Sequence, residues 1–99
     1  MVTYNYKVRR RVINKINAFY TNVAKKYSHT YSLDLMLKNI DEARYAIFFI
    51  EDGLLRREPT LKRWEGLYMT HAKHWYYAYR IEGDTVIVED ACHEQNMHD

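Results

Sequence analysis

The chain of 99 residues has a mass of 12.1 kDa, the size of one small domain, which we place over residues 1–99. Hydrophobic residues make up 47% and charged residues 28%, a balance that excludes a disordered chain. A single cysteine, Cys92, excludes a disulfide scaffold and a zinc site built on several thiolates. No apolar run reaches the roughly 18–20 residues of a membrane span, and no signal-peptide core is present. We therefore expect a cytoplasmic protein that does not enter a membrane.

Charge is distributed unevenly along the chain, although the formal net charge is only +2. Residues 1–80 carry all 15 Lys and Arg and seven acidic residues, whereas residues 81–99 carry six acidic residues and no Lys or Arg. A basic body suits an anionic partner such as nucleic acid, and an acidic segment can fold against that body and screen it. A solvated surface with uneven charge is the other interpretation.

The first half predicts one strand and two helices. Apolar and polar residues alternate over Thr3–Arg9, the pattern of a half-buried strand. Apolar residues then recur at spacings of three and four over Arg10–Tyr27 and Leu33–Ile50, which predicts two helices, with Ser32 as an N-cap and Gly53 as a stop. The expected packing stripes are Val12, Ile13, Ile16, Phe19, Tyr20, Val23 and Tyr27 on the first helix, and Leu33, Met36, Leu37, Ile40, Ala43, Ile47 and Ile50 on the second.

The second half predicts a basic loop followed by strands. The loop covers Leu54–Thr60, and strands are expected over Gly66–His71, Trp75–Glu82 and Thr85–Cys92, the last two joined by a tight turn on Gly83-Asp84. The order is therefore β-α-α-β-β-β. Helices in one block and strands in another indicate an α+β domain, in which the helical hairpin packs on one face of a small, mostly antiparallel, four-stranded sheet.

Alternation along Trp75–Glu82 predicts which side chains face the helices. The core set is Trp75, Tyr77, Tyr79 and Ile81, and the set that looks away from the helices, into a groove or solvent, is Tyr76, Ala78 and Arg80. In the last strand the alternation is blurred, so its faces stay unassigned. Most of the ten tyrosines fall on core stripes, which leaves Tyr68 and Tyr76 as candidates for stacking on bases.

Histidines and cations that can meet on the open side suggest RNA strand cleavage. One histidine can take the proton of the 2′-OH, another can protonate the leaving 5′ oxygen, and cations can stabilise the pentavalent phosphate. This chemistry needs no metal and no cofactor. We expect His93 as acid or base, with Lys73, Arg80 and Arg63 on the phosphate. The wider set consists of His71, His74 and Tyr76, and of Arg56, Arg57 and Lys62 as further nucleic-acid contacts. Solvated surface side chains are the plain alternative.

A zinc site is the other chemistry that the sequence raises. Cys92, His93 and His98 lie close together in the chain. Neighbouring residues of a strand point to opposite faces, however, and the chain has one thiol without a paired motif. We therefore expect no metal site here.

The segment Trp75–Val88 carries a resemblance to a known family. Its aromatic strand ends in Tyr79-Arg80-Ile81, turns on Gly83-Asp84 and returns as a β-branched strand that ends near His93. In this segment, in length and in element order, the chain resembles the RelE/ParE superfamily of toxins from bacterial type II toxin–antitoxin modules, the plasmid-stabilisation type. The resemblance implies a toxin that a cognate antitoxin neutralises. RelE-like members cleave mRNA in the ribosomal A site, whereas ParE-like members poison DNA gyrase and are not nucleases.

The resemblance also implies site residues. His93 lies near the family's C-terminal functional histidine or tyrosine, and His71 and Lys73 lie near preceding basic positions. Tyr76 stands where ribonuclease members often carry Arg, and Glu94-Gln95-Asn96 stands where they often carry Arg or Lys. Fewer cations mean weaker docking on the ribosome. The sequence thus predicts a metal-independent, ribosome-dependent mRNA endonuclease. It leaves open a gyrase poison and a non-toxic nucleic-acid or protein binding module of the same fold.

Overall fold

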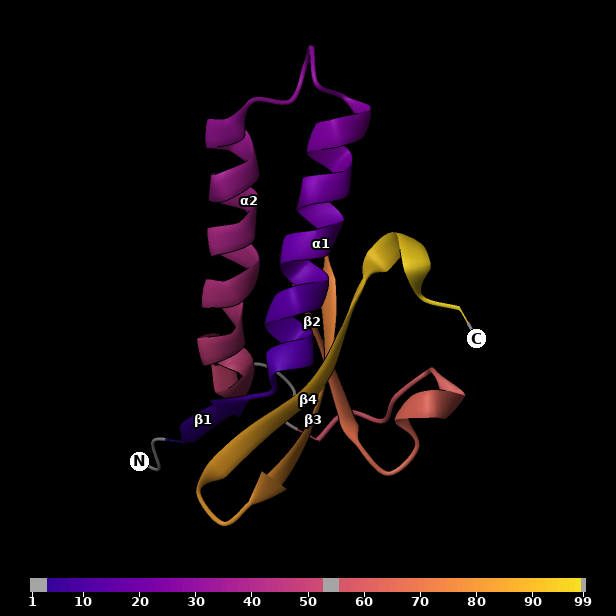
Figure 1. Cartoon of the computed structure of the whole chain (residues 1–99). Helices are drawn as coiled ribbons and strands as arrows, with labels where there is room; N and C mark the ends of the chain where they lie inside the picture. Colours follow the sequence, from indigo (N-terminus) through magenta and orange to yellow (C-terminus); the bar gives the residue numbers. More distant parts are fainter. Residues whose placement is uncertain (1–3, 53–55, 99) are drawn as a thin grey trace.

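The structure is a computed structural model that describes residues 4–52 and 56–98, and its helices and strands follow the predicted order (Figure 1). This confirms the α+β class and the β-α-α-β-β-β order. The longer elements are β1 (Asn5–Val8), α1 (Arg10–Lys26), α2 (Leu33–Ala46), β2 (Tyr68–Ala72), β3 (Trp75–Glu82) and β4 (Thr85–His93). The short 3-10 helices are η1 (Ile47–Asp52), η2 (Lys62–Trp64) and η3 (Glu94–Asn96).

The four strands form one sheet in the order β1-β4-β3-β2. The β2–β3 and β3–β4 pairs are antiparallel, and β1 pairs in parallel with β4, so the sheet is mostly antiparallel as predicted. The α1–α2 hairpin covers one face of this sheet, and its tip projects beyond the end of the strands (Figure 1). The turn between β3 and β4 contains Gly83 at φ +59°, where glycine avoids the steric cost of a side chain.

The predicted helices are correct in position, with two corrections in the second one. Ser32 caps α2 as expected, because its hydroxyl accepts a hydrogen bond from the Leu35 amide at 3.1 Å. The α-helix ends at Ala46, however, and the rest of the predicted helix tightens into η1. Leu33, expected on the packing stripe, is 65% exposed because the hairpin tip extends past the sheet (Figure 1). Leu37 and Tyr27 are exposed for the same reason. The predicted stop at Gly53 lies outside the described residues.

The main core lies between the helices and the predicted inner face of β3. Trp75, Tyr77 and Tyr79 are buried there, which confirms the expectation. The Trp75 indole donates to the Tyr20 hydroxyl at 3.0 Å, and the Tyr77 hydroxyl donates to the Ala43 carbonyl at 2.5 Å. Burial raises the pKa of Tyr77 far above its usual value and the pKa of Tyr79 to about 12.

A second, smaller core covers part of the face that the sequence left open. Ala78 faces away from the helices as predicted, but it is fully buried beneath Leu61 and Trp64 of the segment 56–67, together with Met69 and Cys92. The expectation of a groove or solvent over Ala78 is therefore wrong. The segment before β2 folds back because its apolar side chains can bury against this face of the sheet.

A β-bulge explains why the faces of β4 could not be assigned from the sequence. Ala78 pairs with Asp90 and Tyr79 pairs with Val88, so Glu89 is an extra residue in the ladder. The bulge reverses the alternation. Before it, the even-numbered residues Val86 and Val88 face the helices, and after it the odd-numbered Ala91 does.

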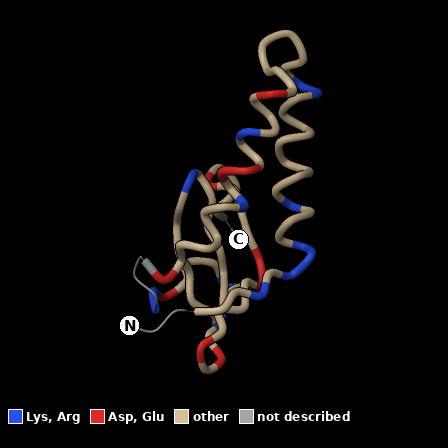
Figure 2. The backbone as a smooth tube through the Cα atoms, turned by 90° about the vertical axis from the view of Figure 1, so that its left-hand side faces the viewer, with Lys and Arg blue, Asp and Glu red and all other residues tan. Residues whose placement is uncertain are grey.

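The acidic segment folds against the basic body, as one of the two interpretations of the charge pattern predicted. Arg9 Nε lies 2.7 Å from Glu89 Oε1, and Lys15 Nζ lies 2.5 Å from Asp90 Oδ1. Figure 2 shows the basic first turns of α1 beside an acidic stretch of the sheet. These ion pairs neutralise cations that the sequence left available for a partner.

Candidate acid–base site

The candidate site lies at the end of the sheet where the β2–β3 turn meets the junction of β4 and η3. The turn consists of Lys73 and His74, both in the left-handed region with φ 51° and 71°. Two-residue hairpin turns of this kind normally use Asn and Gly, so Lys and His hold the turn at a conformational cost. The Glu94 amide donates to the His74 carbonyl at 2.9 Å, which fastens the turn to η3.

Two imidazole rings converge on the carboxylate of Glu94. His71 Nε2 lies 3.0 Å from Glu94 Oε1, and His74 Nδ1 lies 3.0 Å from Glu94 Oε2. The His71 ring also stacks on Tyr76, with the ring centroids 4.3 Å apart and the planes 24° from parallel. Hydrogen bonds from His71 and then His74 lower the pKa of Glu94, so this carboxylate stays ionised and accepts from both rings.

His93 lies on the helix face, on the other side of the sheet from His71 and Tyr76. It is 8% exposed, stacks on Phe19 with ring centroids 4.0 Å apart, and meets Trp75 edge to face. The expectation that His93 meets the other polar residues on the open side is therefore wrong. The reason is the bulge at Glu89, which turns the residues beyond it to the opposite face.

The hydrogen bond of His93 restricts its chemistry. Its Nδ1 accepts the Gln95 amide hydrogen at 3.2 Å, and this contact caps η3. Burial lowers the pKa of His93, an effect that the Glu94 charge opposes and His74 reinforces. A neutral imidazole whose Nδ1 accepts carries its proton on Nε2, so His93 can donate a hydrogen bond but offers no lone pair to a substrate proton.

Arg80 is remote from the histidines. It lies on β3 four residues beyond Tyr76, about 13 Å along the strand. There it forms ion pairs with Glu82 and with Glu89, the latter at 3.6 Å. The structure thus separates Arg80 from the other candidates for the phosphate.

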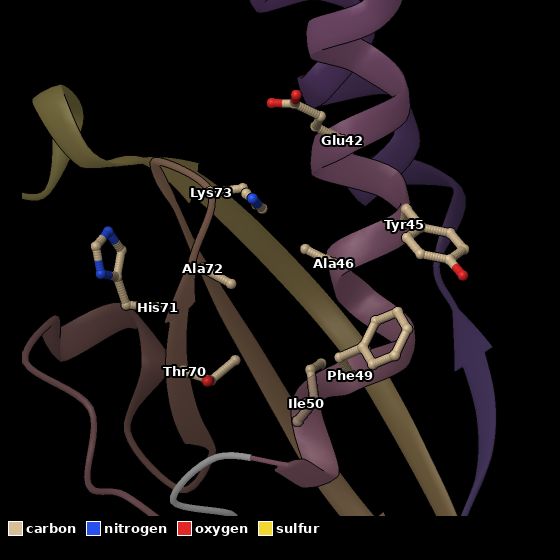
Figure 3. A pocket seen from close by; sticks show the side chains of 9 residues that line it. All are labelled: Glu42, Tyr45, Ala46, Phe49, Ile50, Thr70, His71, Ala72 and Lys73. Carbon is tan, nitrogen blue, oxygen red and sulfur yellow. The ribbon is translucent and has the colours of Figure 1, made fainter.

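Lys73 lies on the opposite side of β2 from His71. Figure 3 shows the Lys73 side chain directed toward α2 and the His71 ring directed away from it. Lys73 lines a groove of about 550 Å³ between β2 and the α2–η1 segment. Most of the surface that lines this groove is apolar, although Glu42 and Lys73 also line it, and Tyr45 in the lining is 65% exposed.

The four basic residues expected to bind nucleic acid lie on the segment 56–67, but they do not share one face of the sheet. Arg56 lies beside Tyr68, which packs against the main core on the helix face, whereas Arg63 lies over the face away from the helices. Arg56 Nη1 donates to the Tyr68 hydroxyl at 3.3 Å. Arg63 donates to Cys92 Sγ at 3.5 Å and to the His98 carbonyl at 3.4 Å. Because Cys92 pairs with Tyr76 in the sheet, Arg63 lies on the same face as the His71–Tyr76 stack. Arg57 and Lys62 are exposed.

Sequence reasoning gave Glu94 no role, although Glu94 organises the site. No local signal in the sequence points to it, because the register set by the Gly83-Asp84 turn would place His74 opposite His93. The extra residue Glu89 shifts the pairing to Trp75 with His93, which brings Glu94 beside His74. Among the described residues, no group of His, Cys, Asp and Glu has the arrangement of a metal site. Cys92 and His93 face opposite sides of the sheet, as the argument against zinc assumed.

No protein-family model, curated protein or solved structure matches this chain. Of the helices in the described part of the chain, none combines the length and apolar character needed to traverse a bilayer.

Proposed function

We propose that this protein is the toxin of a type II toxin–antitoxin module and that it cleaves ribosome-bound mRNA in the cytoplasm without a metal ion. One observation carries the proposal: the rings of His71 and His74 both contact the Glu94 carboxylate, each at 3.0 Å from one of its oxygens. Both rings are accessible to solvent, with 40% and 70% of their side-chain surface exposed. Two imidazoles on one oxyanion form an acid–base pair around the place where a phosphate can bind.

The cleavage step assigns one proton transfer to each ring. One neutral imidazole takes the proton of the 2′-OH, and the 2′ oxygen bonds to phosphorus. The other, protonated, imidazole gives its proton to the 5′ oxygen as the P–O5′ bond breaks. The products are a 2′,3′-cyclic phosphate and a 5′-hydroxyl, and both histidines return to their first states when they exchange protons with water. Arg63 and Tyr76, on the same face, are suited to hold a phosphate and a base.

Two further features support the toxin class. The order of the elements and the hairpin over one face of the sheet are those that the resemblance to RelE/ParE toxins implies. The apolar groove between β2 and the α2–η1 segment offers a partner segment a place to bury apolar side chains. We assign this groove to the cognate antitoxin.

The test is expression of the chain alone under a tight promoter, with growth measured and new RNA 5′ ends mapped within minutes. We expect growth arrest and cuts clustered in translated frames. The double variant His71→Ala/His74→Ala should lose both effects. His29→Ala, an exposed histidine in the α1–α2 connection, is the matched control and should keep both. Equal cleavage by the double variant and the control would contradict the proposed site.

A gyrase poison is the second candidate, and one observation favours it. Arg9, Lys15 and Arg80 are held in ion pairs by Glu89 and Asp90, which weakens the positive field that docking on RNA requires. Growth arrest with DNA damage and without new RNA ends would support this candidate. Absence of growth arrest would indicate a non-toxic binding module.

A further inference from the structure

The Glu94 carboxylate occupies the place that a phosphate would take in the acid–base site. Each of its oxygens accepts from a different ring, His71 Nε2 at one and His74 Nδ1 at the other, both at 3.0 Å. A phosphate group presents a similar pair of oxygens to two donors. The rings are therefore arranged to bind an oxyanion, and the oxyanion already there is supplied by the protein itself.

Part of this arrangement does not depend on the Glu94 side chain, although the carboxylate is the partner that orients the exposed His74 ring. The His71 ring is stacked on Tyr76, and the Glu94 amide bonds to the His74 carbonyl at 2.9 Å. These contacts remain when the carboxylate leaves. The His71 ring and the backbone of the turn therefore keep their positions, and the exposed His74 ring can turn toward another oxyanion bound beside His71.

The Glu94 side chain can leave because little burial holds it. Its side chain is 37% exposed, and it is the first residue of a short 3-10 helix after the last strand. Rotation about its side-chain bonds moves the carboxylate into solvent without disturbing either core. Exposed ion pairs of this kind are weak, so displacing the carboxylate from the two rings costs little free energy.

We propose that Glu94 is an internal competitor for the phosphate-binding site formed by His71 and His74, so that the site is closed to phosphate until Glu94 turns away. This inference rests on the proposed function only where it identifies the phosphate as that of RNA. Phosphate binding to the two rings is independent of toxicity. Loss of the Glu94 charge should open the site and remove a repulsive neighbour of the incoming anion.

The test is a titration with inorganic phosphate at constant ionic strength and about pH 6, followed by NMR of the imidazole resonances of His71 and His74. We expect Glu94→Gln and Glu94→Ala to bind phosphate at His71 and His74 about tenfold more tightly than the unsubstituted chain. Glu58→Gln removes the same charge from an exposed position of the basic segment and should leave binding unchanged. Two variants are used so that neither a residual amide contact nor a local distortion decides the result.

Three outcomes overturn the inference: weaker phosphate binding in both Glu94 variants, which would make Glu94 a positioning residue for the rings; unchanged binding; and an equal gain in Glu58→Gln. The outcome is separable from that of the proposed function. Tighter phosphate binding without RNA cleavage would retain the inference and reject the nuclease. RNA cleavage without tighter binding in either variant would do the reverse.

Discussion

His93 has a structural role that its position in the sequence did not reveal. Its ring packs between Phe19 and Trp75, and its Nδ1 caps η3. These contacts use the ring face and one of the two ring nitrogens. The histidine expected to act as acid or base therefore stabilises the junction of β4 and η3, next to the residues that hold the oxyanion.

Substitutions at His93 distinguish a structural role of this residue from a catalytic one. His93→Ala should lower the free energy of unfolding by about 2–3 kcal/mol, because it removes a cap and a buried aromatic contact. His93→Asn keeps an acceptor for the Gln95 amide and should cost less, and it has no acid–base function. We expect folded His93→Asn to cleave RNA at nearly the original rate, with stability measured by urea denaturation. Loss of cleavage in this folded variant would make His93 catalytic.

The site could be predicted only in part, for reasons visible in particular residues. Period-2 alternation correctly placed Trp75, Tyr77 and Tyr79 under the helices and Tyr76 on the opposite face. It failed at His93 because an extra residue, Glu89, changes the phase of β4, and a bulge leaves no clear mark in composition. The contact of Glu94 with His71 and His74 depends on tertiary register, which no local pattern encodes.

At the scale of the elements, the Asp90 carboxylate of β4 contacts side chains of both α1 and η2. Asp90 Oδ1 lies 2.5 Å from Lys15 Nζ of α1, and Asp90 Oδ2 accepts from the Trp64 indole of η2 at 2.9 Å. Burial opposes ionisation of this carboxyl, but the hydrogen bonds from Lys15, Trp64 and the Ala91 amide outweigh it and lower the pKa of Asp90. Asp90 thus holds both cores together through one ionised side chain.

Asp90→Asn should reduce stability in a pH-dependent way. A lowered folded pKa contributes stability that is fully present above the unfolded pKa, about 3.9, and is lost as the pH falls through the folded pKa. The variant should be less stable by about 1–2 kcal/mol at neutral pH, and this difference should shrink below about pH 4. Urea denaturation across this range is the measurement. Asp41→Asn, on the exposed side of α2, is the control for the loss of charge. A difference that stays constant with pH would refute the assignment.

Over the whole molecule, the acidic segment determines which cations are left for the RNA that we propose as the substrate. Arg9 and Lys15, at the start of α1, form ion pairs with Glu89 and Asp90. Exposed basic residues, among them Arg57 and Lys62, lie on the segment that covers the other face of the sheet. This segment lies on the same side of the sheet as the His71–Tyr76 stack. RNA is therefore expected to approach over the segment 56–67, not over the helices.

Salt dependence of RNA binding tests this orientation. Arg57→Gln/Lys62→Gln should weaken binding of a single-stranded RNA and reduce the slope of log affinity against log salt by about 1.4, since each phosphate contact on a single strand contributes roughly 0.7. Lys25→Gln/Lys26→Gln also removes two positive charges, but from the last turn of α1 in the helical hairpin. This variant should leave the slope nearly unchanged. An equal effect of the two pairs would indicate non-specific attraction to net charge.

The most direct test of the central claim is the end chemistry of mRNA cut by the purified protein on purified ribosomes that carry a labelled message. Proton transfer by His71 and His74 predicts a 5′-hydroxyl and a 2′,3′-cyclic phosphate. It also predicts no cut when the attacking 2′-OH is replaced by hydrogen, and none with His71→Ala/His74→Ala, while His29→Ala cuts normally. Products with a 5′-phosphate, or cleavage that persists in the double variant, would contradict the claim.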